Sequence, residues 1–135
     1  MHEIPVSPDE PLARYILDKS YYRSSDNRVK YNAFMPAKDG DLSVYRLRDL
    51  SLNEIVGIGQ EFVATPRGRP LLGFASLKAE MPLQNRLSVI GTKEPHPRHA
   101  NISSWPGGTE NRLIAVKLAE AATLELLNAG VQPSS

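Results

Sequence analysis

The densest collection of reactive side chains lies between Glu94 and Pro106, in the sequence EPHPRHANISSWP. This stretch combines two imidazoles, a guanidinium and an amide with the single tryptophan of the chain, and it contains three prolines. Because proline lowers the entropy of ordering a loop, such a segment can hold functional groups in fixed positions. Loops held on a rigid scaffold often carry function. We therefore expect residues 94–108 to form a functional loop.

Metal binding is the first chemistry to consider for this loop. Pro97 separates His96 from His99, and it prevents a regular helix from presenting both imidazoles on one face. The chain has no cysteine and only one further histidine, whereas a catalytic zinc usually takes three protein ligands. A site formed by both histidines and Glu94 stays open as an alternative. The simpler interpretation is one exposed histidine and one that hydrogen-bonds the backbone, so we predict no metal and no other cofactor.

Acid–base chemistry is the second option. A histidine with a near-neutral pKa can move protons, and an arginine can hold a phosphate or an oxyanion. The candidate catalytic residues are Arg46 and His99, which would serve a small metal-independent ribonuclease that uses the 2′-hydroxyl of its substrate as nucleophile. This hypothesis requires both residues to share a pocket. The structural alternative is that Arg46 ties a loop down through a carboxylate such as Glu94.

Recognition without catalysis is the interpretation that we prefer, because the polar groups form no complete catalytic set. A binding or interaction module would use the 94–106 loop to contact a protein or a phosphate-bearing ligand. Nucleic acid is a further possible partner, and an exposed apolar face of the last helix could form a homodimer. The candidate ligand- or partner-binding residues are Tyr45, Arg98, Asn101 and Trp105. The structural alternative for a lone tryptophan is a core anchor.

Length and composition limit the class of protein. The chain has 135 residues, a length that suits a single domain over residues 1–135. Its net charge of +1 is too small to indicate a nucleic-acid binder. Without cysteine, disulfides and thiol nucleophiles are excluded. The longest uncharged apolar run covers residues 71–77, far short of the ~20 residues that cross a bilayer. We expect a cytoplasmic protein with no membrane contact.

Hydrophobic periodicity and turn residues predict the elements that must position these side chains. A capping-box pattern at Ser7 predicts a helix over residues 8–19, and alternating residues around the turn pair Asp39-Gly40 predict a β-hairpin over residues 29–46. A second capping box at Ser51 predicts a helix over residues 52–62, in which Gly57 and Gly59 either permit close packing or end the helix early.

The second half of the chain supplies further strands and a long helix. Apolar runs predict buried strands within residues 71–90, and a wide apolar face predicts a helix over residues 110–129. This order of elements predicts an α+β fold. We expect a mostly antiparallel sheet of four or five strands, packed against two or three helices, with the long helix at the C-terminal end.

Two blocks of the sequence carry a family resemblance. The first is DGDLSVYR at residues 39–46, followed by LSLNEI at residues 50–55, and the second is PRHANISSWP at residues 97–106. Together they resemble a set of small uncharacterised bacterial proteins with the pattern DGxLSVYR, LSxxEI, RHANIxxWP. The resemblance spans residues 8–128. It implies a bacterial cytosolic protein and singles out these two blocks, but it implies no activity.

A shorter resemblance concerns another fold. The segment LSVYR at residues 42–46 is similar to the first core strand of ADP-ribosyltransferase-fold proteins, in which a Tyr-Arg or Tyr-His pair meets NAD. The segment GFAS at residues 73–76 is similar to their serine-bearing strand. This implies a nucleotide-modifying toxin as an alternative enzyme function. The glutamate that such enzymes carry near a late strand has no match here.

Overall fold

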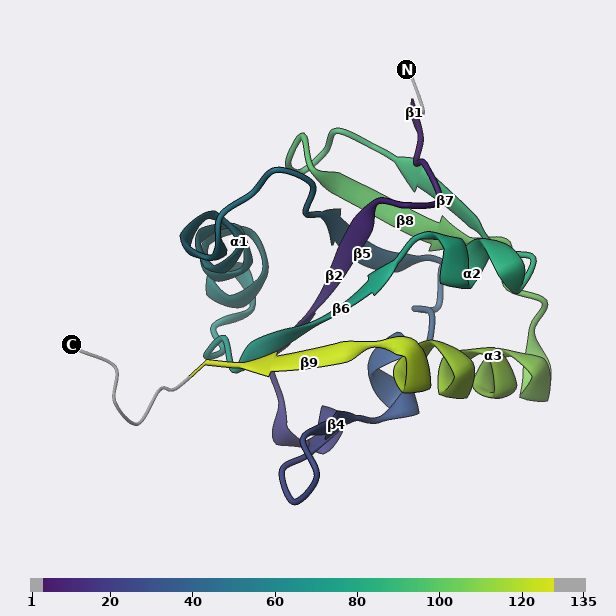
Figure 1. Ribbon diagram of the computed structural model, residues 1–135, viewed down its shortest axis with the longest axis horizontal. Helices are drawn as coiled ribbons and strands as arrows, with labels where there is room; N and C mark the ends of the chain where they lie inside the picture. Colours follow the sequence, from purple (N-terminus) through teal and green to yellow (C-terminus); the bar gives the residue numbers. More distant parts are fainter. Residues whose placement is uncertain (1–3, 128–135) are drawn as a thin grey trace.

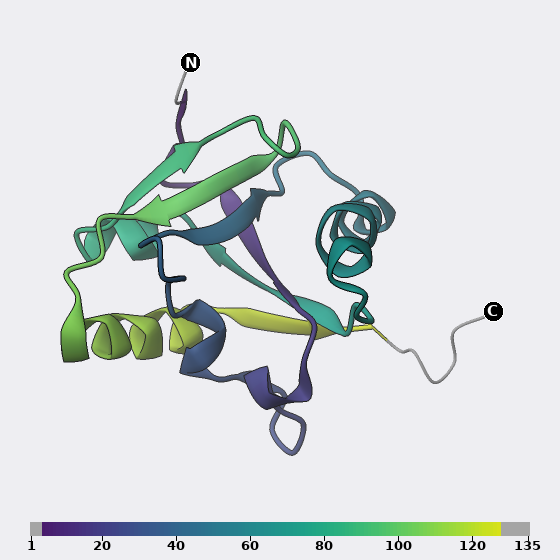
Figure 2. The same cartoon turned by 180° about the vertical axis from the view of Figure 1, so that it is seen from behind.

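An antiparallel seven-stranded sheet runs through the molecule, as the computed structural model shows (Figures 1 and 2). The structure describes the backbone of residues 4–127 and the side chains of residues 6–127. The strand order is β1-β7-β8-β5-β2-β6-β9, and every neighbouring pair is antiparallel. The strands are β1 (Ile4–Pro5), β2 (Pro11–Ile16), β5 (Leu42–Arg46), β6 (Gly73–Lys78), β7 (Ser88–Gly91), β8 (His99–Ser103) and β9 (Thr123–Leu126).

Helices cover both faces of this sheet. Figure 1 shows α1 (Leu52–Ile58) on one side, and α2 (Glu80–Gln84) and α3 (Gly108–Ala121) on the other. The α1 helix continues as a π-helical turn, η3 (Gly59–Ala64), and a 3-10 turn, η4 (Thr65–Arg67). The remaining elements are η1 (Lys19–Tyr21), the two-stranded ribbon β3 (Tyr22–Arg23) and β4 (Arg28–Val29), and η2 (Tyr31–Phe34). Within residues 4–127, no helix is long and apolar enough to cross a membrane.

Two apolar cores result from this arrangement. The α3-side core gathers Leu12, Ile16, Phe34, Val44, Ile102 and Leu118, among others. The α1-side core gathers Ala13, Tyr15, Tyr45, Ile55, Ile58 and Phe74, among others. Successive residues of β2 and β5 alternate between the two cores, as strand geometry requires. The central strands therefore carry apolar side chains on both faces, alongside the polar residues Arg14, Ser43 and Arg46.

The predicted fold class is confirmed, with more strands than expected. The fold is α+β, with an antiparallel sheet and three α-helices. Six strands contain four or more residues, and the two-residue β1 extends the edge beside β7, so that the expected four or five strands were too few.

Two predictions for the N-terminal half were wrong. Residues 11–16 form β2 in place of the helix predicted over residues 8–19, because its side chains enter the two cores alternately and hide the strand period. Residues 29–46 do not form a hairpin. Tyr31–Phe34 is a 3-10 helix whose Phe34 is fully buried in the α3-side core, and β5 pairs with β2 and β8.

The C-terminal predictions also need correction. The helix predicted over residues 110–129 ends at Ala121, and β9 follows it to pair with β6. The free edge of β6 and the buried Leu124 explain this strand, because an unpaired buried edge leaves its backbone groups without partners. The predicted helix end at residues 128–129 lies outside the described residues. The predicted loop 94–108 contains the strand β8, which lies between β7 and β5.

Candidate functional site

The sheet opens between β2 and β5, and a cavity of about 140 Å³ lies at the opening. All six residues of β2 pair with β6, whereas only Leu12 and Ala13 pair with β5. Beyond these two pairs the strands are not hydrogen-bonded along the ladder, so side chains can occupy the space between them. The cavity is lined by Arg14, Tyr15, Ser43, Tyr45, Phe62, Val63, Arg67, Pro95 and His99.

Arg14 bridges the opening from β2. Its Nε donates to the main-chain oxygen of Ala33 at 2.8 Å, and its Nη1 donates to the main-chain oxygen of Ser43 on β5 at 3.0 Å. Burial and the nearby charge of Arg67 lower the pKa of Arg14 to about 10. The guanidinium is therefore charged at neutral pH, while its bonded partners are neutral carbonyl groups.

Arg67 supplies a second guanidinium to the cavity. It ends the 3-10 turn η4, which Gly68 terminates in the left-handed region at φ 61°. The ion pairs among the described residues involve Arg23, Arg46, Arg48 and Arg69. Within the described part of the chain, neither cavity arginine has a carboxylate partner, and no acidic side chain lines the cavity. The cavity lining is therefore positively charged, and the carboxylate of Asp41 lies close enough to act on His99 from outside the lining.

His99 reaches the cavity from the first position of β8, and both of its ring nitrogens are engaged. Its residue is 7% exposed, its Nδ1 lies 2.6 Å from Thr92 Oγ1, and its Nε2 lies 3.2 Å from Ser43 Oγ. The ring also packs edge-on against Tyr45, with centroids 5.2 Å apart. These contacts hold the imidazole in one orientation. Burial lowers the pKa of His99, so the neutral form predominates at pH 7.

The aromatic wall of the cavity comes from two tyrosines. Tyr15 donates its hydroxyl to the main-chain oxygen of Ile55 at 2.6 Å and packs edge-on against Tyr45 at 5.5 Å. Burial raises the pKa of both phenols, and for Tyr45 the Arg67 charge acts in the opposite direction. Both tyrosines are therefore neutral at pH 7 and contribute apolar surface.

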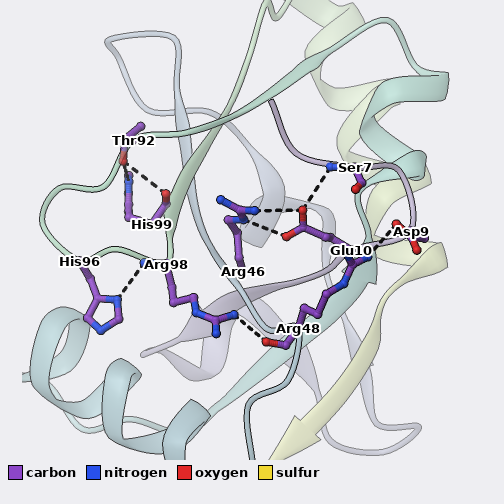
Figure 3. A network of polar contacts seen from close by, with 9 residues as sticks. All are labelled: Ser7, Asp9, Glu10, Arg46, Arg48, Thr92, His96, Arg98 and His99. Atoms are coloured by element: carbon purple, nitrogen blue, oxygen red, sulfur yellow. Dashed lines mark hydrogen bonds and ion pairs between the residues drawn. The ribbon is translucent and has the colours of Figure 1, made fainter. Parts of the chain in front are cut away.

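The predicted catalytic pair is not brought together. Tyr45 pairs with His99 in the sheet register, so these two side chains share the α1-side face, and the adjacent Arg46 points to the other face. Figure 3 shows Arg46 directed at Glu10, and His99 directed at Thr92. Arg46 lines a separate hollow with Glu10, Arg48, Asp49, Pro97 and Arg98. The two residues thus lie in different cavities.

Arg46 and Glu10 form an ion pair in which the glutamate is buried and the arginine is partly exposed. Arg46 Nε lies 2.8 Å from Glu10 Oε1, and Arg46 Nη2 lies 3.1 Å from Glu10 Oε2. The main-chain nitrogen of Ser7 also donates to Glu10 Oε2 (Figure 3). Burial raises the pKa of Glu10, but the hydrogen bonds from Arg46 and Ser7 outweigh it, and the pKa lies below its ordinary value. Glu10 is therefore the carboxylate that Arg46 binds.

The other predicted contact residues are distributed over different surroundings. Tyr45 lines the cavity, and Asn101 pairs with Ser43 in the register of β5 and β8. Arg98 donates to the main-chain oxygen of Arg48 at 2.6 Å, on the side of the Arg46 hollow. Trp105 donates to the main-chain oxygen of Ile102 and packs against the α3-side core.

Sequence reasoning missed several residues of the cavity region, among them Arg14, Ser43 and Thr92. Arg14 stood within a predicted helix, Ser43 appeared only as part of a strand, and Thr92 preceded the expected loop. Arg14 carried one usable signal: it is a charged residue between the apolar positions of a segment that is otherwise buried. A charge at such a position needs a partner or a cavity.

The lowered pKa of His99 predicts that the stability of the protein depends on pH. Because its folded-state pKa is below the ordinary value of 6.5, the unfolded chain binds more protons as the pH falls below that value. We expect the free energy of unfolding to be unaffected by His99 above about pH 7 and to fall from there towards about pH 5. Urea denaturation of the wild type and of His99→Gln across this range measures the effect, and equal slopes in the two proteins would contradict it.

Within the described residues, no three His, Cys, Asp or Glu side chains converge as a metal site. The cavity instead combines two arginines, a neutral histidine and a serine, a set suited to anions and to proton transfer. No known protein-family model matches the chain, and no characterised protein and no solved structure is significantly similar to it.

Proposed function

We propose that the protein binds a small anionic ligand, bearing a phosphate or a carboxylate, in the cavity between β2 and β5. The observation that carries this proposal is that Arg14 and Arg67 both line the cavity and that neither has a carboxylate partner among the described residues. A charge removed from water is costly unless it is paired. A bound anion would supply the missing partner.

The chemistry of the two arginines supports an oxyanion as ligand. A guanidinium has five N–H donors, of which Arg14 uses two on main-chain oxygens. The remaining donors suit the bidentate binding of phosphate or carboxylate. Repulsion between Arg14 and Arg67 would also be relieved by a ligand charge between them.

The dimensions of the cavity support a small ligand group. A volume of about 140 Å³ is below the range of ~300–1,000 Å³ that is typical of drug-sized ligands. It is close to the ~150 Å³ of an engineered cavity that holds benzene. The site suits a single phosphate or a short carboxylic acid, and the Tyr15 and Tyr45 rings suit an apolar part of the same ligand.

This proposal keeps part of the loop hypothesis. Pro95 and His99 line the cavity, so the segment after Lys93 contributes to recognition, whereas Arg98 and Trp105 are engaged elsewhere. The two sequence blocks that resemble small bacterial proteins support a bacterial cytoplasmic origin as part of the same proposal.

Calorimetric titration with inorganic phosphate and with succinate, at constant ionic strength, tests the binding. We expect saturable 1:1 binding of at least one of these anions. Arg67→Gln should weaken the binding by about tenfold, because a hydrogen bond to a charged group contributes ~1.5–3 kcal/mol. Arg67 is exposed at the end of η4, so its replacement should leave the fold intact.

Arg69→Gln is the matched control, since it removes the same charge two residues away. Arg69 pairs with Asp18 and does not line the cavity. Its replacement should change the affinity by less than about twofold, because exposed ion pairs contribute little. Equal weakening in both variants would indicate unspecific attraction, and the absence of saturable binding to either anion would refute the site.

A further inference from the structure

We propose, resting on the anion site proposed above, that the cavity is a hydrolytic site in which Ser43 Oγ attacks a small anionic carboxylic ester and His99 acts as its base. The observation behind this inference is the continuous hydrogen-bonded chain from Ser43 Oγ through both ring nitrogens of His99 to Thr92 Oγ1. A nucleophile, a base and a group that orients the base are the three parts that serine hydrolases require.

The direction of the hydrogen bonds follows from the surroundings of Thr92. Thr92 Oγ1 lies 2.8 Å from the main-chain oxygen of Glu94 and 3.4 Å from that of His99. Because a carbonyl oxygen only accepts hydrogen bonds, Thr92 donates its single hydroxyl proton to these main-chain oxygens. Its Oγ1 then accepts a hydrogen bond from His99 Nδ1–H. His99 Nε2 then carries the lone pair and accepts the hydroxyl proton of Ser43. This is the tautomer in which the imidazole can activate the serine.

Because Ser43 lines the cavity, a ligand there can reach the hydrogen-bonded chain of Ser43, His99 and Thr92. Ser43 and His99 both line the cavity, together with Arg14 and Arg67. The backbone carbonyl of Ser43 holds Arg14, which couples the position of the nucleophile to that of the anion-binding group. Packing of the His99 ring against Tyr45 fixes the base. The low pKa that burial gives His99 keeps it neutral and able to accept a proton at pH 7.

The reaction balances with water as the only co-reactant. Ser43 Oγ forms a bond to the ester carbonyl carbon while its proton passes to His99 Nε2. The bond between that carbon and the leaving oxygen then breaks, and the alcohol departs with the proton from His99. A water molecule attacks the acyl-serine, gives its proton to His99 and releases the carboxylic acid, and the proton returns to Ser43 Oγ. The substrate class is an ester whose acyl part ends in a carboxylate or phosphate that the arginines bind.

The test uses mono(4-nitrophenyl) succinate, a small ester with a free carboxylate, and follows the release of 4-nitrophenolate. We expect saturable hydrolysis by the wild type, a succinyl group on Ser43 in the mass spectrum after rapid quenching, and at least a hundredfold loss of rate in Ser43→Ala and His99→Gln. Ser88→Ala is the control, because Ser88 pairs with Ser104 at an exposed position outside the cavity. It should retain the wild-type rate.

Phosphate and succinate binding by Ser43→Ala separates this inference from the proposed function. The substitution keeps the main-chain oxygen that accepts from Arg14, so anion binding should persist while hydrolysis is lost. Wild-type protein that binds these anions but hydrolyses no faster than Ser43→Ala would refute the hydrolytic site and leave the binding site standing. Acylation of a residue other than Ser43 would also refute it, and failure of anion binding in the wild type would overturn both proposals.

Discussion

Arg46→Met is expected to lower the free energy of unfolding by about 3 kcal/mol, since removal of one partner of a buried ion pair leaves the other charge without compensation. The Glu10 side chain is 6% exposed and that of Arg46 is 22% exposed, so water replaces little of the lost interaction. The methionine retains most of the apolar contact of the arginine stem. Equilibrium urea denaturation at pH 7 measures the difference from the wild type.

The pair between Arg48 and Asp9 provides a matched control. These side chains are 42% and 76% exposed, and exposed pairs contribute ~0–1 kcal/mol. Arg48→Met should therefore have a small effect, and the double variant Glu10→Gln/Arg46→Met should be more stable than Arg46→Met alone. A loss in Arg46→Met no larger than that in Arg48→Met would show that the buried pair does not stabilise the fold.

The ion pair between Arg46 and Glu10 also predicts that the stability difference between wild type and Arg46→Met depends on pH. The folded-state pKa of Glu10 lies below its ordinary value of 4.5, so its contribution is fully present above that value and is lost as the pH falls through the folded-state pKa. The stability difference between wild type and Arg46→Met should therefore shrink below about pH 4. This window lies below the one expected for His99, so the two groups can be separated in one pH series.

Gly59→Ala is expected to destabilise the protein by about 2 kcal/mol, the usual cost of forcing extra volume into a packed core. A Cβ atom at Gly59 would overlap the ring of Tyr15, which is held by its hydrogen bond to Ile55 and by its packing against Tyr45 and Phe74. Because Tyr15 also lines the cavity, anion binding should weaken in the same variant. Thermal and urea denaturation, with phosphate titration, measure both effects.

Gly57→Ala separates this steric effect from helix propensity. A Cβ at Gly57, inside α1, meets nothing within 4 Å, so the substitution should stabilise the helix by ~0.5–1 kcal/mol. Stability changes of opposite sign in Gly57→Ala and Gly59→Ala would identify the clash with Tyr15 as the cause of the destabilisation. Stabilisation by both substitutions would contradict the close packing of Gly59 against the ring.

Local signals were sufficient for several elements. The capping box of Ser51 and Glu54 is present, because both of its hydrogen bonds lie within four residues and need no tertiary partner. Strand β6 and most of β7 fall within the predicted residues 71–90, where β6 is a largely continuous run of buried residues and β7 alternates between buried and half-buried residues. The α+β class follows from elements of this kind.

The segments that local signals misassigned are those that depend on distant partners. Leu12, Ile16 and Leu17 have a spacing that suits a helix face, but β2 sits between β5 and β6 and sends apolar side chains into both cores. Likewise, β9 forms only because β6 offers it an edge. Strand β2 leaves no clear period-2 pattern in the sequence, because both of its faces are buried. The alternating residues TLEL of β9 were included in the predicted helix over residues 110–129.

By itself, the sequence determined the α+β class, the cap of α1 at Ser51 and the concentration of imidazole and guanidinium groups after Lys93, because residue type and short-range hydrogen bonds decide these features. Only the tertiary structure decided which groups meet. Strand alternation directs Arg46 to Glu10 and His99 to the opposite face, and the opening between β2 and β5 brings Arg14 beside Ser43. The contact between Arg14 and Ser43 joins residues 29 positions apart, and that between Arg46 and Glu10 joins residues 36 positions apart. Both contacts depend on the register that the sheet imposes on all of its strands.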